Sequence, residues 1–506
     1  MNNFLKAVAL LVAIACSVWV AVLWRWQITA RDMSVQDIAA YLVLLPLVVF
    51  GFALALRWAW RGAVARHALR ASGATPIGVG AASAVPVARS ADEAHRGDTS
   101  QLLGAFLACA AGESAGDLLS AAKSGAPRPS LDPELRDAAG LPVFAARMLD
   151  LLPSSLAPWF EPGLGAARGQ REEWATAEAP EHVLRALAAL QEPLTDALRT
   201  LTPWAARFES AADAPRGGLP PCRVRLLLGW PFDWTAFEQA LGMAAVRHLV
   251  ADAAAAPIAA ECFVVTAHVG SGEELLLHAD RLMQSLARDA HSEPVIVAAC
   301  HSAIGEAAVG ALEREGTLYS SDRRPKGRMP GEGAAALVLA PADWPVDPEA
   351  DGPACHLHRP AVMRRDKSVD APGRVGSDIA VQSMTQALVA SGLEAERIAA
   401  VVCDADQHTA RTAEFHVGGI ALFSTLDSGD DMHLIGTVTG GVGPVSALMV
   451  VACAAELAKK LEKPCLAATF GDLYARLALV ALPGAPAPKS PPAAGAIHAA
   501  AKYDAA

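Results

Sequence analysis

The stretch that decides the fold runs from Arg328 to Ala340 and has the sequence RMPGEGAAALVLA. A turn with the sequence Pro-Gly-Glu-Gly leads directly into an entirely apolar run, Ala334 to Leu339. Gly331 and Gly333 lack a Cβ, so they allow positive φ and a close backbone approach. The run is short and is bounded by Gly and Pro, which favours a buried strand over a core helix. The sequence therefore predicts a tight loop followed by a buried strand.

Short apolar runs alternate with helical patterns over most of the chain, which is typical of an α/β domain. The predicted strands are Val224–Leu228, Cys262–Ala267, Val295–Ala299, Ala334–Leu339, Ile398–Val402 and Leu477–Leu482. The predicted helices include Glu273–Ala287, Val375–Ser391 and Val445–Leu461. A strand followed by polar residues and a helix, and later by a closing apolar run, occurs twice. The sequence therefore also suggests two similar halves.

The composition indicates a chain that can bury a large core. Its 506 residues allow two or three domains, and they are 53% hydrophobic and 19% charged. The net charge of −11 argues against nucleic acid as the main partner. The nine cysteines are odd in number and contain no CxxC pair. This pattern indicates reduced thiols in a cytosolic domain, mostly buried as small hydrophobic side chains.

Two apolar stretches near the N-terminus predict membrane spans. Phe4–Trp24 and Ile38–Leu56 are each about 20 residues long, enough to cross the hydrocarbon core as helices. Tryptophans stand toward the end of the first stretch and just after the second, where interfacial aromatics belong. A signal peptide is disfavoured because the apolar run continues through Val18-Trp19-Val20, without a small-residue cleavage site. Lipidation at Cys16 is the weaker alternative.

The arginines predict the orientation of these spans. The loop Arg25–Asp37 holds two arginines and two aspartates, whereas Arg57, Arg61, Arg66 and Arg70 follow the second span with no acid among them. The positive-inside rule puts both ends in the cytoplasm, joined by a short outer loop. We therefore expect a multi-pass protein of the bacterial inner membrane, with a cytoplasmic C-terminal domain.

Together with the preceding SSDRRPKG, the quoted stretch resembles the segment that closes the first half of the ketosynthase branch of the thiolase superfamily. The resemblance extends from about Cys262 to Leu482. Its further motifs are GSGEELLLHADRLM from Gly270, VIVAAC, VVCDADQHTARTAE, TVTGGVGPVSAL and TFGDLYARLALVAL. It implies a pseudo-duplicated α/β fold. The expected domains are two transmembrane helices (1–60), a tether (61–100), a first thiolase-like half (101–345), a second half (346–483) and a disordered tail (484–506).

That family uses a cysteine nucleophile and two histidines. By the resemblance, the cysteine position falls on Val269 and the first histidine position on Cys403-Asp404-Ala405. The second falls on Gly441-Val442, or on Gly443-Pro444 if the register slips. The nearby candidates for substitutes are His268, His408 and Cys262. Because no position matches, the prediction is a scaffold without catalytic, cofactor-binding or metal-binding residues, and so not an enzyme.

Three weaker patterns lead to the same prediction. Ser271 lacks the glycines of a nucleophile elbow, since Val269 and Glu273 flank it. The cluster Cys355, His356 and His358 has no second pair to complete a zinc site. The glycines at 436, 440, 441 and 443 precede a helix but are not followed by Lys-Ser/Thr, so we expect a close-packed turn rather than a phosphate site.

Two spans, a tether and a degenerate thiolase-like double domain together resemble the type VI secretion lipase adaptors of the Tla type. This resemblance implies an adaptor that binds a lipase effector and helps load it onto the secretion spike. It also allows a homodimer, and it implies no nucleic acid and no cofactor. The alternative function is a membrane-bound ketosynthase-like enzyme that binds or condenses acyl groups. A third hypothesis is a structural component of a membrane complex.

The predicted topology is testable with reporter fusions. Four arginines close behind the second span should hold the C-terminal domain in the cytoplasm. Alkaline phosphatase fused after Arg70 should be inactive, whereas phosphatase inserted between Arg31 and Asp37 should be active. The reverse pattern would refute this topology and, with it, the cytosolic assignment of the cysteines.

Overall fold

The computed structural model describes residues 99–156, 178–207, 223–252, 258–288, 293–342, 344–345, 355–371 and 376–484. The predicted spans Phe4–Trp24 and Ile38–Leu56, the tether 61–98 and almost all of the tail lie outside these residues. Of the helices within the described ranges, none combines the length and hydropathy needed to cross a bilayer. The two predicted spans therefore stay a prediction.

The described residues form one large mixed sheet in which the same strand order occurs twice. The first five strands are β1 (Thr99–Cys109), β4 (Val224–Trp230), β5 (Phe263–Val269), β6 (Val295–Ser302) and β7 (Glu332–Pro341). They lie in the order β5-β4-β6-β7-β1, with β4, β5 and β6 parallel and β7 antiparallel to both neighbours.

The second five are β8 (Cys355–His358), β10 (Ala400–Cys403), β11 (Met432–Leu434), β12 (Cys465–Ala468) and β13 (Ala475–Pro483). Their order is β11-β10-β12-β13-β8, again with the fifth strand antiparallel. Both sets thus have the order 3-2-4-5-1, and β1 joins β8 between them. The predicted α/β fold with two similar halves is confirmed. The boundary at 345/346 borders residues outside the description and stays a prediction.

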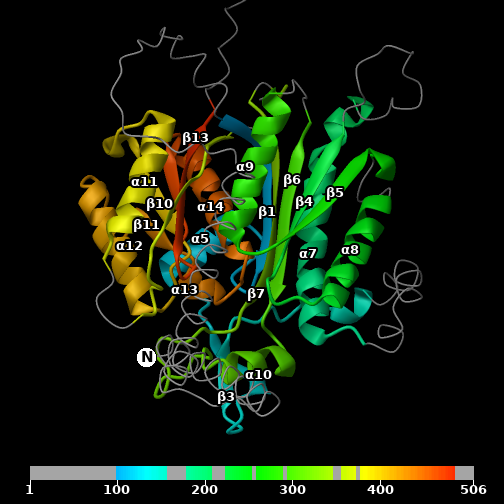
Figure 1. Cartoon of the computed structure of the whole chain (residues 1–506), viewed down its shortest axis with the longest axis vertical. Helices are drawn as coiled ribbons and strands as arrows, with labels where there is room; N and C mark the ends of the chain where they lie inside the picture. The colour runs from blue at the N-terminus through cyan, green and yellow to red at the C-terminus, as the bar shows by residue number, and fades with distance from the viewer. Residues whose placement is uncertain are drawn as a thin grey trace, which may run out of the picture. The chain divides into compact units, whose positions relative to one another are not determined.

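Helices cover both faces of each half and one layer is shared (Figure 1). On the first half lie α7 (Glu181–Thr200) and α8 (Ala236–Ala251), and on the second α11 (Asp378–Ser391) and α12 (Thr409–Leu422). Between the halves lie α5 (Ala115–Ser124), α9 (Gly272–Arg288) and α14 (Val445–Leu461). Helix α14 is apolar on nearly all sides because it is enclosed by protein, as expected for a central helix.

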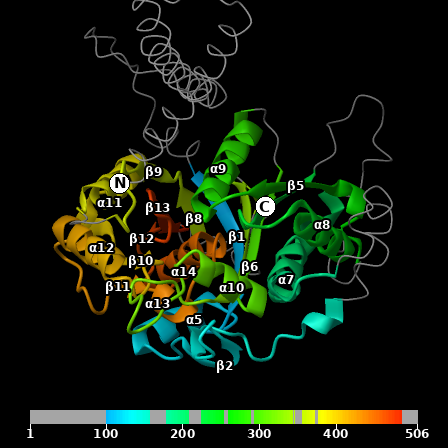
Figure 2. The same cartoon turned by 60° about the horizontal axis from the view of Figure 1, so that its bottom comes forward.

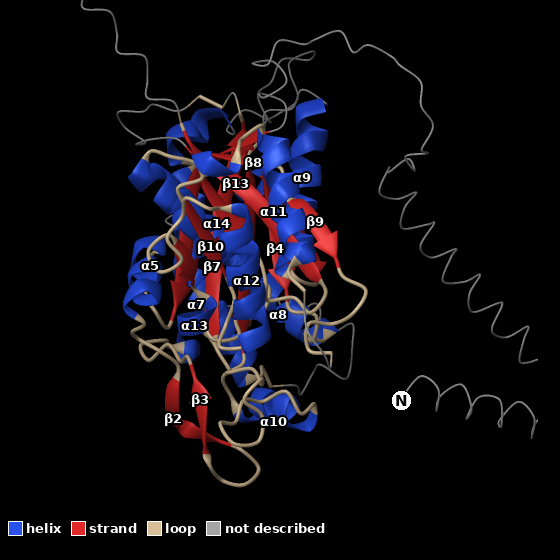
Figure 3. Ribbon diagram, turned by 90° about the vertical axis from the view of Figure 1, so that its left-hand side faces the viewer, coloured by secondary structure: helices blue, strands red, loops and turns tan. Residues whose placement is uncertain are grey.

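The remaining elements lie at the edges of this core. The strands β2 (Ser130–Arg136) and β3 (Pro142–Ala145) form a separate hairpin near α10 (Glu306–Arg314) (Figures 2 and 3). Strand β9 (Ala361–Arg364) pairs with β13, and α13 (Gly436–Thr439) precedes α14. The elements η2 (Pro153–Leu156), η4 (Thr202–Arg207), η5 (Ala260–Cys262) and η6 (Ala395–Arg397) are short 3-10 turns.

A buried ion pair fixes the start of β7. Glu332 is fully buried and accepts bonds from Arg185 Nε at 2.8 Å and Nη2 at 2.6 Å. The same carboxylate accepts from Met148 N at 2.7 Å and from Ser302 Oγ at 2.9 Å. One side chain therefore ties β7 to α7, β6 and the segment that follows β3, and no charge is left unpaired.

The predicted strand after the Pro-Gly-Glu-Gly turn is confirmed as β7, but only one of the two reasons predicted for its glycines, close backbone approach, is confirmed. Neither Gly331 nor Gly333 has a positive φ. A Cβ on Gly333 would lie 2.6 Å from Ala108 O and 3.0 Å from Met449 Cε, and one on Gly331 would strike Thr439 O. Close backbone approach to β1, α13 and α14 is therefore the reason for glycine here, and the conformational argument is wrong.

This close packing predicts a cost for any side chain at position 333. Replacing Gly333 by Val should lower the free energy of unfolding by about 1–3 kcal/mol, because Ala108 and Met449 must move. Gly310 on α10 has open space around it, so Gly310→Ala is the matched control and should not destabilise. Urea unfolding measures both, and equal stability of the two variants would contradict the packing described.

Candidate functional site

The N-termini of α9 and α14 meet at the centre of the described fold. Both helices follow the third strand of their half, so they hold equivalent places. A Cβ on Gly272 would lie 2.6 Å from Ala447 Cβ and would strike Pro444 O, so the first turns of the two helices touch. A helix N-terminus carries free N–H groups and a partial positive charge. Two such ends at one place favour an anion or a developing negative charge.

Two buried carboxyl groups lie at this junction. Glu273 and Asp404 are each 5% exposed. Burial, and then the charge of Asp404, raise the pKa of Glu273 to about 7, although the Thr469 hydroxyl works in the opposite direction. Burial also raises the pKa of Asp404, against hydrogen bonds from its neighbours. Two carboxylates that are close and desolvated do not both ionise readily, so the pair holds a proton near neutral pH.

Asp404 is held by the loop that precedes β13. Its Oδ1 accepts from Gly471 N at 3.1 Å and from Phe470 N. The nearby Ser446 hydroxyl donates to Gly443 O, which leaves Asp404 Oδ2 without a hydrogen-bond partner. The same hydroxyl can rotate and donate to Asp404 instead. The junction thus combines a proton-holding carboxyl group, a free carboxylate oxygen and a hydroxyl that can rotate.

The positions that the resemblance assigned to the catalytic cysteine and the two histidines contribute little to this carboxylate site. Val269, at the end of β5, is 41% exposed and offers no nucleophile. Cys403 is fully buried at the end of β10, and burial raises the pKa of its thiol well above the usual value. Val442, at the second histidine position, is apolar and 1% exposed, and Gly441 before it donates its N–H to Met329 O at 2.8 Å. Asp404 alone, of the residues aligned with the first histidine, belongs to the carboxylate site.

The three candidate substitutes each have a structural role of their own. Cys262 is buried just before β5, so the length of that strand separates it from Val269. His268 packs edge-on to His278, with 5.7 Å between ring centroids. His408 caps α12 by accepting from Ala410 N, and its Nε2 lies 3.0 Å from Asp370 Oδ1. None of these contacts forms a cysteine–histidine pair.

The metal and glycine patterns also have structural explanations. Cys355 is fully buried in β8, and burial raises the pKa of its thiol to about 12. Across the described ranges, no group of three or more His, Cys, Asp or Glu side chains is arranged to hold a metal ion. The predicted glycine turn packs closely, since a Cβ on Gly436 would lie 2.8 Å from Ala405 O.

Four residues of this region were not predicted as site residues from the sequence: Glu273, Thr469, Ser446 and His301. His301 is the last residue but one of β6, and its ring lies 2.9 Å from the place of a Cβ on Gly443. Burial lowers the pKa of His301 to about 4, against the charge of Asp233, and Nδ1 lacks a hydrogen-bond partner. A neutral imidazole therefore stands beside the loop that begins α14. The only sequence signal was a polar residue at the end of an apolar run.

No family model matches this sequence, and no curated protein matches it either. Solved structures do match. The ketosynthase ApeO in complex with its chain length factor ApeC from Xenorhabdus doucetiae is 12% identical, with a TM-score of 0.50 over 76% of this chain and 98% of that chain. The oxazolomycin ketosynthase domain OzmH KS7 of Streptomyces albus JA3453 is 14% identical, with a TM-score of 0.48 over 78% and 76%. The ishigamide ketosynthase/chain length factor is 16% identical, with a TM-score of 0.46 over 77% and 100%.

The match to the ApeO–ApeC structure agrees with the repeated strand order, and the fold is thiolase-like. The prediction that this chain is not an enzyme is wrong in its premise. It took missing motif residues as the absence of an enzyme, whereas the fold is similar to that of a solved ketosynthase structure and buried titratable groups lie at the helix junction.

The raised pKa of Glu273 predicts a loss of stability with rising pH. In the folded state Glu273 keeps its proton up to about pH 7, whereas the unfolded chain releases it near the ordinary glutamate pKa of 4.5. The folded state therefore binds more protons in this window, and stability falls as pH rises through it, on the order of 3 kcal/mol. In Glu273→Gln the loss of stability between about pH 4.5 and pH 7 should be absent. Urea unfolding at several pH values tests this, with Glu274→Gln, at an exposed carboxylate, as the control that keeps the fall.

Proposed function

We propose that this chain is a ketosynthase-like enzyme of acyl thioesters, whose step at the α9/α14 junction is removal of the α-proton. The observation that carries the proposal is Glu273, a buried carboxyl group with a pKa of about 7. A general base works best when its pKa lies near the operating pH. Glu273 is therefore suited to accept and return a proton at neutral pH, which an ordinary surface glutamate does poorly.

The chemistry fits the electrostatics of the junction. When Glu273 takes the α-proton, the electron pair of the broken C–H bond moves onto the thioester oxygen as an enolate. Backbone N–H groups at the two helix ends suit such an oxyanion. The enolate carbon can then attack the carbonyl of a second acyl thioester, expelling its thiol and giving a β-ketoacyl thioester. This route needs no covalent acyl-enzyme, which suits a chain with Val269 at the nucleophile position.

A protein partner is part of the proposal. The solved ketosynthase ApeO is in complex with its chain length factor. Among the described residues, β5 is the last strand of the sheet, with no neighbour on one side, and Thr266, Ala267 and Val269 are exposed on it. An open edge accepts a strand from another chain. We propose pairing here with a second copy or a related subunit, and anchoring at the bacterial inner membrane.

A second candidate role is loading a lipase effector onto the type VI secretion spike. Val269 and Val442, which stand at the cysteine position and at the second histidine position, favour a scaffold that binds proteins. Such binding would use surfaces away from the buried carboxyl groups. It should therefore be insensitive to substitutions at the α9/α14 junction, which separates it from the enzymatic proposal.

The enzymatic proposal predicts exchange of α-protons. The protein should exchange the α-hydrogens of octanoyl-CoA for deuterium in D₂O, followed by NMR. Glu273→Gln should lower the rate by about 10²-fold or more, because the base is lost. Glu274→Gln alters the next residue, whose carboxylate instead caps the helix through Ser271 N, and should exchange as the wild type does.

The residues once considered as triad substitutes provide the opposite control. Alanine at Cys262, His268, Cys403 or His408 should leave exchange intact wherever the variant folds. A covalent acyl adduct, lost in only one cysteine variant, would contradict the non-covalent route. A stable complex with a lipase effector, together with no exchange by the wild type, would favour the secretion role.

A further inference from the structure

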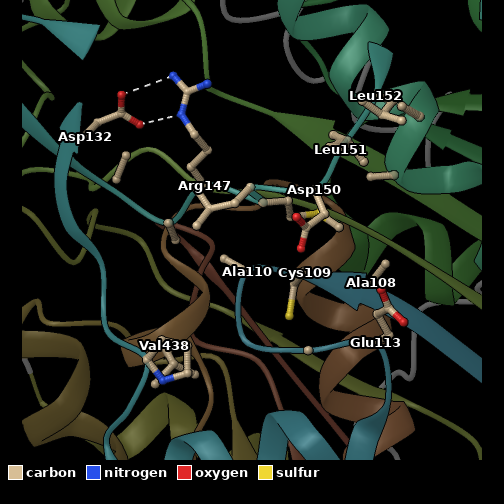
Figure 4. Close-up of a pocket in the computed structure, with 18 of the residues that line it drawn as sticks. Ala108, Cys109, Ala110, Glu113, Asp132, Arg147, Asp150, Leu151, Leu152 and Val438 are labelled. Atoms are coloured by element: carbon tan, nitrogen blue, oxygen red, sulfur yellow. Dashed lines mark hydrogen bonds and ion pairs between the residues drawn. The ribbon is translucent and has the colours of Figure 1, made fainter. Parts of the chain in front are cut away.

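A cavity of about 710 Å³ lies away from the carboxylate site. It is bounded by the end of β1, the β2–β3 hairpin, the segment that follows β3 and one side of α7 (Figure 4). None of Glu273, Asp404, Ser446 and Thr469 lines it. Its volume is in the range that holds small molecules in proteins. Neither the proposed enzymatic step nor the secretion role uses it.

Small apolar side chains line the cavity together with polar and charged groups. The alanines that line it are Ala108, Ala110, Ala145, Ala146, Ala188 and Ala189. Cys109 also lines it, and burial raises the pKa of this thiol to about 11, so it stays neutral. Alanine side chains leave room for a guest, and the apolar part of the lining favours an apolar segment of that guest.

The charged groups deep in the cavity are already neutralised. Arg147 donates from Nε to Asp132 Oδ2 at 2.6 Å and from Nη2 to Oδ1 at 3.1 Å (Figure 4). Its Nη1 lies 3.2 Å from Glu134 Oε2. Asp132 is 1% exposed and Arg147 is 11% exposed. A planar guanidinium held in this way has no free donor fork for an anionic ligand.

The rim of the cavity carries both carboxylates and exposed leucine side chains. Glu113, Asp150 and Glu192 line the cavity with no ion pair to any residue in the described part of the chain, against one cation, Arg128. Leu149 and Leu152 stand beside them with 80% and 69% of their surfaces exposed. Large apolar side chains this exposed at the mouth of a cavity mark a binding surface.

We propose that this cavity binds an amphiphilic cation, a molecule with an apolar chain and an ammonium or guanidinium head. The chain lies on the alanine walls and against Leu149 and Leu152. The head lies at the rim, where three carboxylates face one cation. An anionic amphiphile of the same length meets the same walls but a repulsive rim, so charge, and not the chain alone, selects the ligand.

The test is calorimetric titration of the full chain with octylammonium and with octanoate, which share a chain and differ in charge, with heats of protein-free micelles subtracted. We expect octylammonium to bind about tenfold more tightly than octanoate. The double variant Glu113→Gln/Asp150→Asn should lose that preference, whereas Glu396→Gln, an exposed carboxylate of the second half, should keep it.

A larger side chain in the cavity wall tests the contribution of the walls to binding separately from that of the rim. Ala188→Leu, on α7, should weaken both probes, and Ala110→Leu gives the same test at the end of β1 should the first variant not fold. Equal binding of the two probes, no binding of octylammonium, or unchanged binding in both leucine variants overturns the proposal. Deuterium exchange by Glu273 is unaffected by any of these results, so this inference and the enzymatic proposal fail separately.

Discussion

The buried carboxylate of Glu332 is the constraint on which the rest of the structure depends. It stands at the first residue of β7, next to the glycines that let β1, α13 and α14 approach, and Arg185 completes its hydrogen bonds from α7. Loss of either partner would leave a charge with no water around it, which typically costs about 3–5 kcal/mol. Because Met148 and Ser302 bond to the same group, this single pair sets the positions of both the cavity wall and the end of β6.

The carboxylate site depends on the same closeness of approach. Glycine at 272 lets α9 and α14 touch, and this contact removes water from Glu273 and Asp404. Desolvation, and then the charge of Asp404, raise the pKa of Glu273 to about 7. The site thus arises from helix placement and burial, and not from a motif of reactive residues.

The fold could be predicted from the sequence far better than the site. The run Ala334–Leu339 is apolar on every residue, which is enough to indicate a strand buried on both faces, and β7 is that strand. For the glycines before it, the predicted positive φ is wrong and the predicted close approach is right, but a sequence does not reveal which backbone comes near. Glu273 follows a helix start, where an acidic residue is usually an exposed cap. Burial, and then the charge of Asp404 more than 100 positions away, raise the pKa of Glu273, and the residues next to Glu273 in the sequence reveal neither cause.

The repeated strand order has a consequence for stereochemistry. Glu273 is the second residue of α9, and Ser446 is the second residue of α14, so matched places in the two halves carry a carboxyl group and a hydroxyl. A substrate held between the two helix ends would meet unlike groups on its two faces. In the proposed step the base Glu273 stands on one side only, so the α-proton would leave from one prochiral position.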